Sequence, residues 1–174
     1  MTHESGVYLT LTLVACAMAA LGLVVRRANR VLAIATLVLL AATLTLVWLR
    51  GANHESETTH RTLVLAAGAL AVLGGGLVTT LVFSFIDGGE RVRQAGQVLR
   101  GGAWIGALER LAVFVTLVAG WGPGLAIVLA VKGLGRYPEL RNDEDTGVAE
   151  RFIIGTFTSV LWAAGCAGLA LLAA

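Results

Sequence analysis

The residues that could do chemistry in this chain are a few ionisable side chains set in apolar sequence between residues 101 and 172. Glu109 and Arg110 come first, and Lys132, the only lysine of the chain, follows together with Arg136. Acidic and basic side chains held away from water pair with one another, bind an ion, or bind the charged headgroup of a lipid. Which of these they do depends on the elements that position them.

The composition predicts that those elements are membrane-spanning helices. Hydrophobic residues make up 57% of the 174 residues and charged residues 14%, whereas a soluble domain carries about 25% charged residues. The charges lie in short clusters between long apolar runs, which is typical of a multi-pass helical membrane protein and not of a β-barrel. No basic run with interleaved aromatic residues indicates a nucleic-acid partner, and no His/Cys spacing predicts a metal or another cofactor.

Six apolar runs approach the roughly 20 residues that a helix needs to cross a bilayer. The segment from Trp104 to Tyr137 is too long for one crossing, and the sequence GWGP at Gly120–Pro123 favours a tight turn within it. We therefore predict a single all-α integral membrane domain over residues 1–174, whose fourth and fifth helices form a hairpin. The predicted helices cover about residues 6–25, 31–49, 63–86, 104–120, 123–139 and 149–172.

The basic residues predict how this bundle is oriented. With six crossings, all but two of the 13 lysine and arginine residues fall on one side of the membrane, the exceptions being Arg50 and Arg61. Because basic residues are enriched in cytoplasmic loops, that side is predicted to be cytoplasmic, with both termini outside. The expected location is the bacterial cytoplasmic (inner) membrane.

The hairpin brings Glu109 and Lys132 to the same depth. Glu109 lies eleven residues before Gly120, and Lys132 lies nine residues after Pro123. At a rise of ~1.5 Å per residue, the two differ in depth by only a few ångströms. They are also the deepest of the ionisable residues, and we expect them to face each other.

Further polar residues at this level extend the pair into a predicted charge cluster on the cytoplasmic side. Arg136 and Glu139 share the helix face of Lys132, because the three are spaced i, i+4, i+7. Arg110 points about 100° away from Glu109 on its helix, and we expect it to face lipid headgroups instead. The candidate binding residues are Glu109, Arg110, Lys132, Arg136, Glu139, Glu150, Thr156 and Ser159.

Two interpretations of function follow from this cluster. An unpaired charge in the membrane core costs at least ~2.5–3.5 kcal/mol, so mutual pairing is the simplest reason for keeping several. In one interpretation, the protein is a small transport protein, or binds an ion or a lipid headgroup at the cluster. In the other, it is a non-catalytic membrane subunit or scaffold whose charges are a structural clasp. Catalysis is less favoured, because no histidine lies in the predicted helices and the acids are matched by bases.

Small residues recur along two of the predicted helices and indicate close helix contact. Such stripes serve packing within one chain, or contact with a second copy or another protein, and the sequence does not separate these uses. Membrane lipids are the other expected partners. The stripes are Ala67, Ala71 and Gly75, and Gly155, Ser159, Ala163 and Ala167.

The last three predicted helices resemble those of an uncharacterised family of bacterial integral membrane proteins. The stretches GGAWIGALERLAVFVTLVAG, GLAIVLAVKGLGRYPEL and AERFIIGTFTSVLWA, between Gly101 and Ala163, carry this resemblance through the order and spacing of rare polar residues. The resemblance implies the topology and the polar cluster. It implies no reaction.

Overall fold

The protein is all-α, as predicted. The computed structural model describes residues 3–25, 29–50, 57–86, 102–142 and 146–172, and it describes their side chains except those of 3–5, 50, 138–142 and 146–148. The helices are α1 (His3–Val24), α2 (Asn29–Arg50), α3 (Glu57–Ile86), α5 (Gly102–Val118), α6 (Gly122–Asn142) and α7 (Thr146–Leu172). Each predicted helix falls on one of these six.

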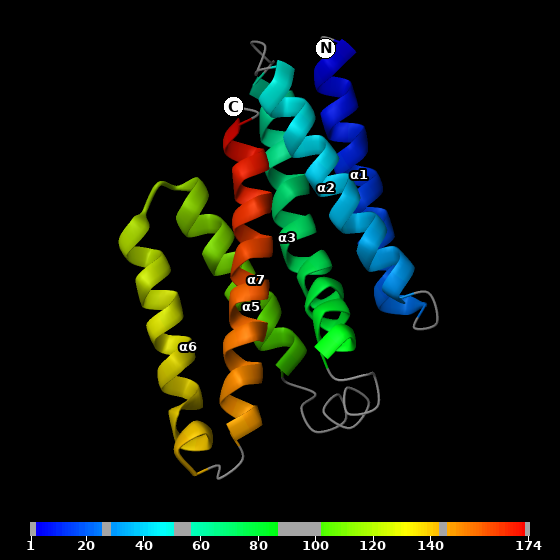
Figure 1. Ribbon diagram of the computed structural model, residues 1–174. Coiled ribbons are helices and arrows are strands. Elements are labelled where there is room, and N and C mark those ends of the chain that lie inside the picture. Colours follow the sequence, from blue (N-terminus) through cyan, green and yellow to red (C-terminus); the bar gives the residue numbers. More distant parts are fainter. Residues whose placement is uncertain (1–2, 26–28, 51–56, 87–101, 143–145, 173–174) are drawn as a thin grey trace.

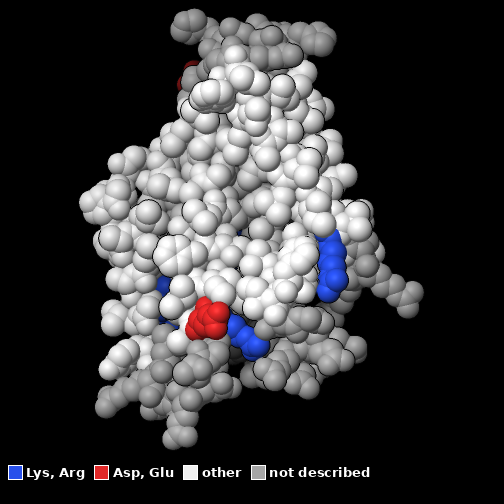
Figure 2. Space-filling view, in the orientation of Figure 1, with Lys and Arg blue, Asp and Glu red and all other residues white. Residues whose placement is uncertain are grey.

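Four of the helices are long and apolar enough to cross a membrane, which makes this a multi-pass membrane protein. The four spans are Gly6–Val24, Asn29–Leu49, Glu57–Ile86 and Ala149–Leu172. On the face shown in Figure 2, a broad band without charged side chains crosses the upper half of the molecule, and several lysine, arginine and acidic side chains are visible below it. Such a band is the surface that lipid tails require.

Helix α3 is the centre of the bundle. It packs against α1, α2, α5 and α7, whereas α6 packs on α5 and lies at the outer edge (Figure 1). Both chain ends lie at the same end of the bundle in Figure 1, as an even number of crossings requires. The structure does not identify which end faces the cytoplasm, so the predicted orientation stays a prediction.

The hairpin of α5 and α6 is closed by a glycine turn at the predicted position. Gly120 has a φ of 66°, in the left-handed region that glycine adopts without strain. The N–H of Trp121 donates to the carbonyl of Thr116 over 2.9 Å, and the N–H of Gly120 donates to Leu117 over 3.0 Å. This pair of bonds is a Schellman motif, which ends α5 and satisfies its last carbonyls.

Helix α3 differs most from its predicted range. Helix α3 begins at Glu57, six residues before the predicted Leu63, because the polar segment that precedes the apolar run continues the helix. Helix α5 has the predicted length of 17 residues, which is about 25 Å at 1.5 Å per residue and is shorter than the ~30 Å hydrocarbon core. The hairpin turn accordingly stops below the level of the chain ends in Figure 1.

The small-residue stripes lie inside the bundle. Ala67 and Ala71 of α3 and Ala163 and Ala167 of α7 are all buried in the core. Close approach of α3 and α7 therefore accounts for these positions. Whether the protein also has a homodimeric or other protein partner stays a prediction.

Candidate functional site

Arg110 lies at mid-depth in the bundle, and its side chain is hydrogen-bonded to the backbone of α3. Its side chain is 9% exposed. Both Nε and Nη2 donate to the carbonyl oxygen of Val72, over 3.2 and 3.0 Å. Val72 is 15 residues from Glu57 and 14 from Ile86, the two ends of α3, so the guanidinium is about 21 Å from either end of that helix. The expectation that Arg110 faces lipid headgroups is therefore wrong.

Glycines of α3 make room for this arginine. A Cβ on Gly75 would lie 2.2 Å from Cδ and 2.6 Å from Nε of Arg110, so no side chain fits there. Without side chains the helix backbone is accessible, and a carbonyl already bonded within the helix accepts a further bond through its second lone pair. Arg110 turns inward toward this bare surface, where the carbonyl of Val72 accepts its hydrogen bonds.

A second N–H donor, from α7, binds the same stretch of α3. The indole Nε1 of Trp162 donates to the carbonyls of Leu70 and Ala71, each over 3.2 Å. The ring covers Gly74, where an added Cβ would lie 2.4 Å from the ring carbon Cζ2. Arg110 and Trp162 thus bind three consecutive carbonyls, and they fix α5 and α7 on α3.

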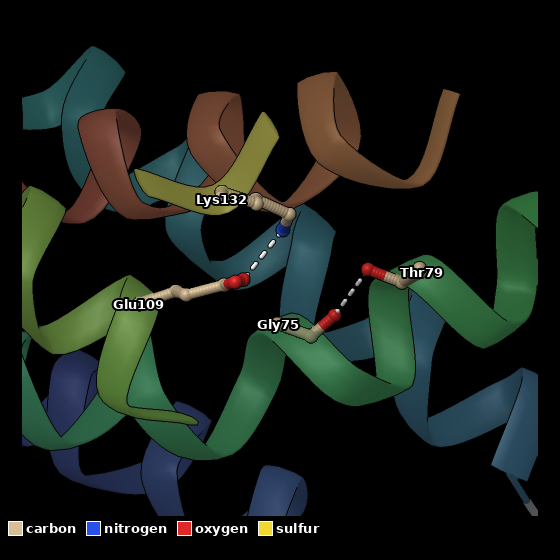
Figure 3. Close-up of polar contacts among 4 residues, drawn as sticks. All are labelled: Gly75, Thr79, Glu109 and Lys132. Carbon is tan, nitrogen blue, oxygen red and sulfur yellow. Dashed lines mark hydrogen bonds and ion pairs between the residues drawn. The ribbon is translucent and has the colours of Figure 1, made fainter. Parts of the chain in front are cut away.

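Glu109 and Lys132 meet across the hairpin, as predicted from their depth. Lys132 Nζ donates to Glu109 Oε2 over 2.5 Å, and the two side chains are 17% and 20% exposed, respectively. Figure 3 shows Glu109 of α5 and Lys132 of α6 pointing toward each other. It also shows the Thr79 hydroxyl donating to the Gly75 carbonyl within α3. This ion pair joins the outer helix α6 to the bundle.

A small cleft joins the ion pair to Arg110. Its free volume is about 10 Å³, which is room for about one water-sized group. Three helices form it, and its lining contains ionisable and hydroxyl side chains as well as aliphatic ones. The lining residues are Glu109, Arg110 and Val113 of α5, Val128, Leu129 and Lys132 of α6, and Ser159 and Val160 of α7.

The remaining predicted site residues lie outside this cleft. Arg136 is half-buried on α6, one helical turn beyond Lys132, and Glu150 is exposed on α7. The Thr156 hydroxyl is buried, and it has no hydrogen-bond partner in the described part of the protein. The side chain of Glu139 is outside the described residues. Of the eight candidates, the structure therefore brings together Glu109, Arg110, Lys132 and Ser159.

The cleft carries one net positive charge. Its ionisable lining residues are one acid and two bases, and the acid Glu109 pairs with Lys132. Within the described parts of the chain, no carboxylate forms an ion pair with Arg110. A guanidinium has five N–H donors. Two bind Val72, and the other three make no hydrogen bond to a described residue.

Sequence reasoning missed both partners of the α3 carbonyls. The signal that could have found them is the run LGGG at Leu73–Gly76, three glycines in the middle of a membrane helix. Glycines there cost helix stability relative to alanine, so they indicate that a large side chain packs against the backbone. Only Gly75 of this run was predicted to lie at a contact, as part of a small-residue stripe between helices.

Comparison with protein-family models, curated proteins and solved structures gives no match for this chain.

Proposed function

We propose that this protein is an anion-binding membrane protein that holds a negatively charged group, from an ion or a lipid headgroup, in the cleft between α5, α6 and α7. The observation that carries the proposal is the charge of Arg110. This side chain lies at mid-depth beside the cleft. Among the described residues, three of its N–H donors make no hydrogen bond and no carboxylate forms an ion pair with it.

A bound anion would offset the free-energy cost of placing the charged Arg110 side chain at this depth. A charged arginine at the centre of a bilayer costs at least ~2.5–3.5 kcal/mol, and ionisable residues at that depth commonly mark ion or substrate sites. One carbonyl acceptor supplies hydrogen bonds but no opposite charge. A bound anion would supply both, because its oxygens or its bare charge can accept the unused N–H groups. The Ser159 hydroxyl and the Lys132 ammonium, which line the same cleft, are further donors.

A second candidate function is that of a membrane subunit or scaffold whose charges only fix the fold. The contact between Glu109 and Lys132 favours it, because the two groups are already paired at 2.5 Å and need no ligand. That contact does not explain why a charged side chain, Arg110, lies at mid-depth. Anion binding does explain it, and it is therefore the primary proposal. Transport of the bound anion is one use of such a site.

The two functions are separated by replacing Arg110 with a neutral donor. Arg110→Gln removes the charge and keeps an N–H donor for Val72. We expect anionic lipid or phosphate to raise the melting temperature of the wild-type protein in neutral detergent, because a ligand that binds only the folded state stabilises it. We expect Arg110→Gln to lose that rise, and the exposed control Arg61→Gln to keep it.

Opposite results would support the structural role. If neither anion raises the wild-type melting temperature, or if Arg110→Gln keeps the whole rise, the proposed anion site is wrong. A lower basal melting temperature for Arg110→Gln, with no anion effect in the wild type, is what a purely structural arginine predicts.

The location in a bacterial cytoplasmic membrane and the relationship to the uncharacterised bacterial family belong to this proposal as well. The arginine distribution supports the first. The polar residues of α5, α6 and α7 support the second.

A further inference from the structure

We infer that the negatively charged group belongs to a membrane lipid, whose phosphate enters the cleft sideways, between α6 and α7. This inference rests on the proposed function and adds to it the source of the anion and its route. Three observations support this inference. They are the open side of the cleft, the small volume of the cleft, and the order of the basic residues along α6.

In the described part of the chain, no tightly packed wall closes the cleft between α6 and α7. Both helices contribute lining residues, Val128 and Leu129 from α6 and Val160 from α7. Yet α6 packs on α5 and makes no extensive contact with α7. The open side of the cleft is therefore a seam between α6 and α7, and in this proposal lipid lies outside that seam.

The size of the cleft excludes a fully enclosed phosphate. A free volume of about 10 Å³ admits one oxygen-sized group, so only part of an oxyanion can enter while the rest stays in the seam. Aliphatic side chains line the seam, and an acyl chain gains free energy beside them through the hydrophobic effect. A free, fully hydrated phosphate would instead have to leave water and lie against those aliphatic walls. A lining that contains both ionisable and aliphatic side chains can bind the phosphate of a lipid and also contact its acyl chain.

Basic residues of α6 lead from the end of the helix to the cleft. Arg136 lies six residues before Asn142, the end of α6, and Lys132 lies four residues deeper, beside the cleft. At 1.5 Å per residue these positions are about 9 and 15 Å from the helix end. A lipid phosphate at headgroup level meets Arg136 first and Lys132 next. Because an ammonium has three N–H donors, Lys132 can bind a phosphate oxygen while it stays paired with Glu109.

The test is the retention of lipid by the protein in native mass spectrometry. The protein is transferred from detergent micelles that contain equal amounts of phosphatidylglycerol, which is anionic, and phosphatidylcholine, which has no net charge. We expect the wild type to retain one phosphatidylglycerol in preference to phosphatidylcholine. Val160→Phe should fill the seam and reduce that preference at least about tenfold. Leu161→Phe, on the exposed neighbouring position of the same helix, is the matched control and should retain the preference.

A parallel melting experiment with inorganic phosphate separates the sources of the anion. If phosphate raises the melting temperature while neither lipid is preferred, the anion comes from water. The lipid inference is then wrong, although the proposed function stands. If neither lipid nor phosphate binds, both are wrong. If Val160→Phe does not fold, Leu129→Trp narrows the same seam from α6, and retention of phosphatidylglycerol by that folded variant would contradict the route.

Discussion

Arg110 and Gly75 interlock, with the arginine side chain lying in the space that any side chain at position 75 would need. A Cβ on Gly75 would come within 2.2 Å of Arg110 Cδ. The contact places a guanidinium against the backbone of α3 halfway along a membrane helix. The cleft charge, the proposed anion site and the attachment of α5 all depend on it.

Gly75→Ala should therefore destabilise the protein. The new methyl group overlaps Arg110 and approaches Trp162 Cδ1 to 3.0 Å, and overpacking of this kind typically costs about 1–3 kcal/mol. The measurement is the free energy of unfolding in mixed micelles. Gly76→Ala is the matched control, because a Cβ on Gly76 meets nothing within 4 Å and alanine favours the helix. Equal stability of the two variants would contradict the interlock.

The ion pair between Glu109 and Lys132 should show strong coupling in a double-mutant cycle. Removing one partner leaves the other charge partly buried and unpaired. A fully buried pair loses ~3–5 kcal/mol in this way, while removing both partners costs far less, and the partial exposure here lowers the expected loss. We expect Glu109→Gln and Lys132→Met each to lower the free energy of unfolding, and the double variant to recover much of the loss.

The control for that cycle is the pair of Glu57 and Arg61. These residues also form an ion pair at 2.5 Å, but their side chains are 78% and 74% exposed. Surface pairs of this kind contribute at most about 0.5 kcal/mol. Additive effects at Glu109 and Lys132, no larger than those of the control, would mean that the two groups do not form the predicted contact.

Trp162→Phe should weaken the attachment of α7 to α3. The substitution removes the N–H that the Leu70 and Ala71 carbonyls accept, and the loss of one such bond costs about 0.5–1.5 kcal/mol. The measurement is the shift in melting temperature relative to Trp104→Phe, which changes an exposed tryptophan. A larger shift for Trp104→Phe would show that the indole bond contributes nothing.

The topology is tested by single cysteines in a Cys16→Ala, Cys166→Ala background, labelled with a reagent that does not cross the membrane. Asn53→Cys and Gln97→Cys, both outside the described residues, should react from opposite sides. Gly122→Cys, next to the hairpin turn, should react from the side of Asn53→Cys. Reaction of Asn53→Cys and Gln97→Cys from one side would overturn the six-helix topology. Protection of Gly122→Cys from both sides would show that the short hairpin does not reach the far surface.

Helix number, helix positions and the central contact of the hairpin could be predicted from the sequence. Apolar runs of fixed length specify helices in a membrane, since the backbone must satisfy its hydrogen bonds internally. A glycine turn of known position then fixes which residues of two neighbouring helices lie at one depth. The contact between Glu109 and Lys132 could be predicted from the position of this turn alone.

The placement of Arg110 could not be predicted in this way. Helical periodicity gives the direction of a side chain relative to its own helix, and it does not show which neighbouring helix lies there. Arg110 turns inward because α3, which lies between α5 and α1, offers bare carbonyls at that depth. The packing of α3 against both α5 and α7 is a long-range property that spacing within single helices does not contain.

The most direct test of the anion site is an electron-density map of the protein crystallised from a lipid phase that contains phosphatidylglycerol. We expect non-protein density within hydrogen-bond distance of the Arg110 guanidinium, continuing outward between α6 and α7 past Val160. An empty or water-filled cleft, or a carboxylate of the protein paired with Arg110, would contradict the account.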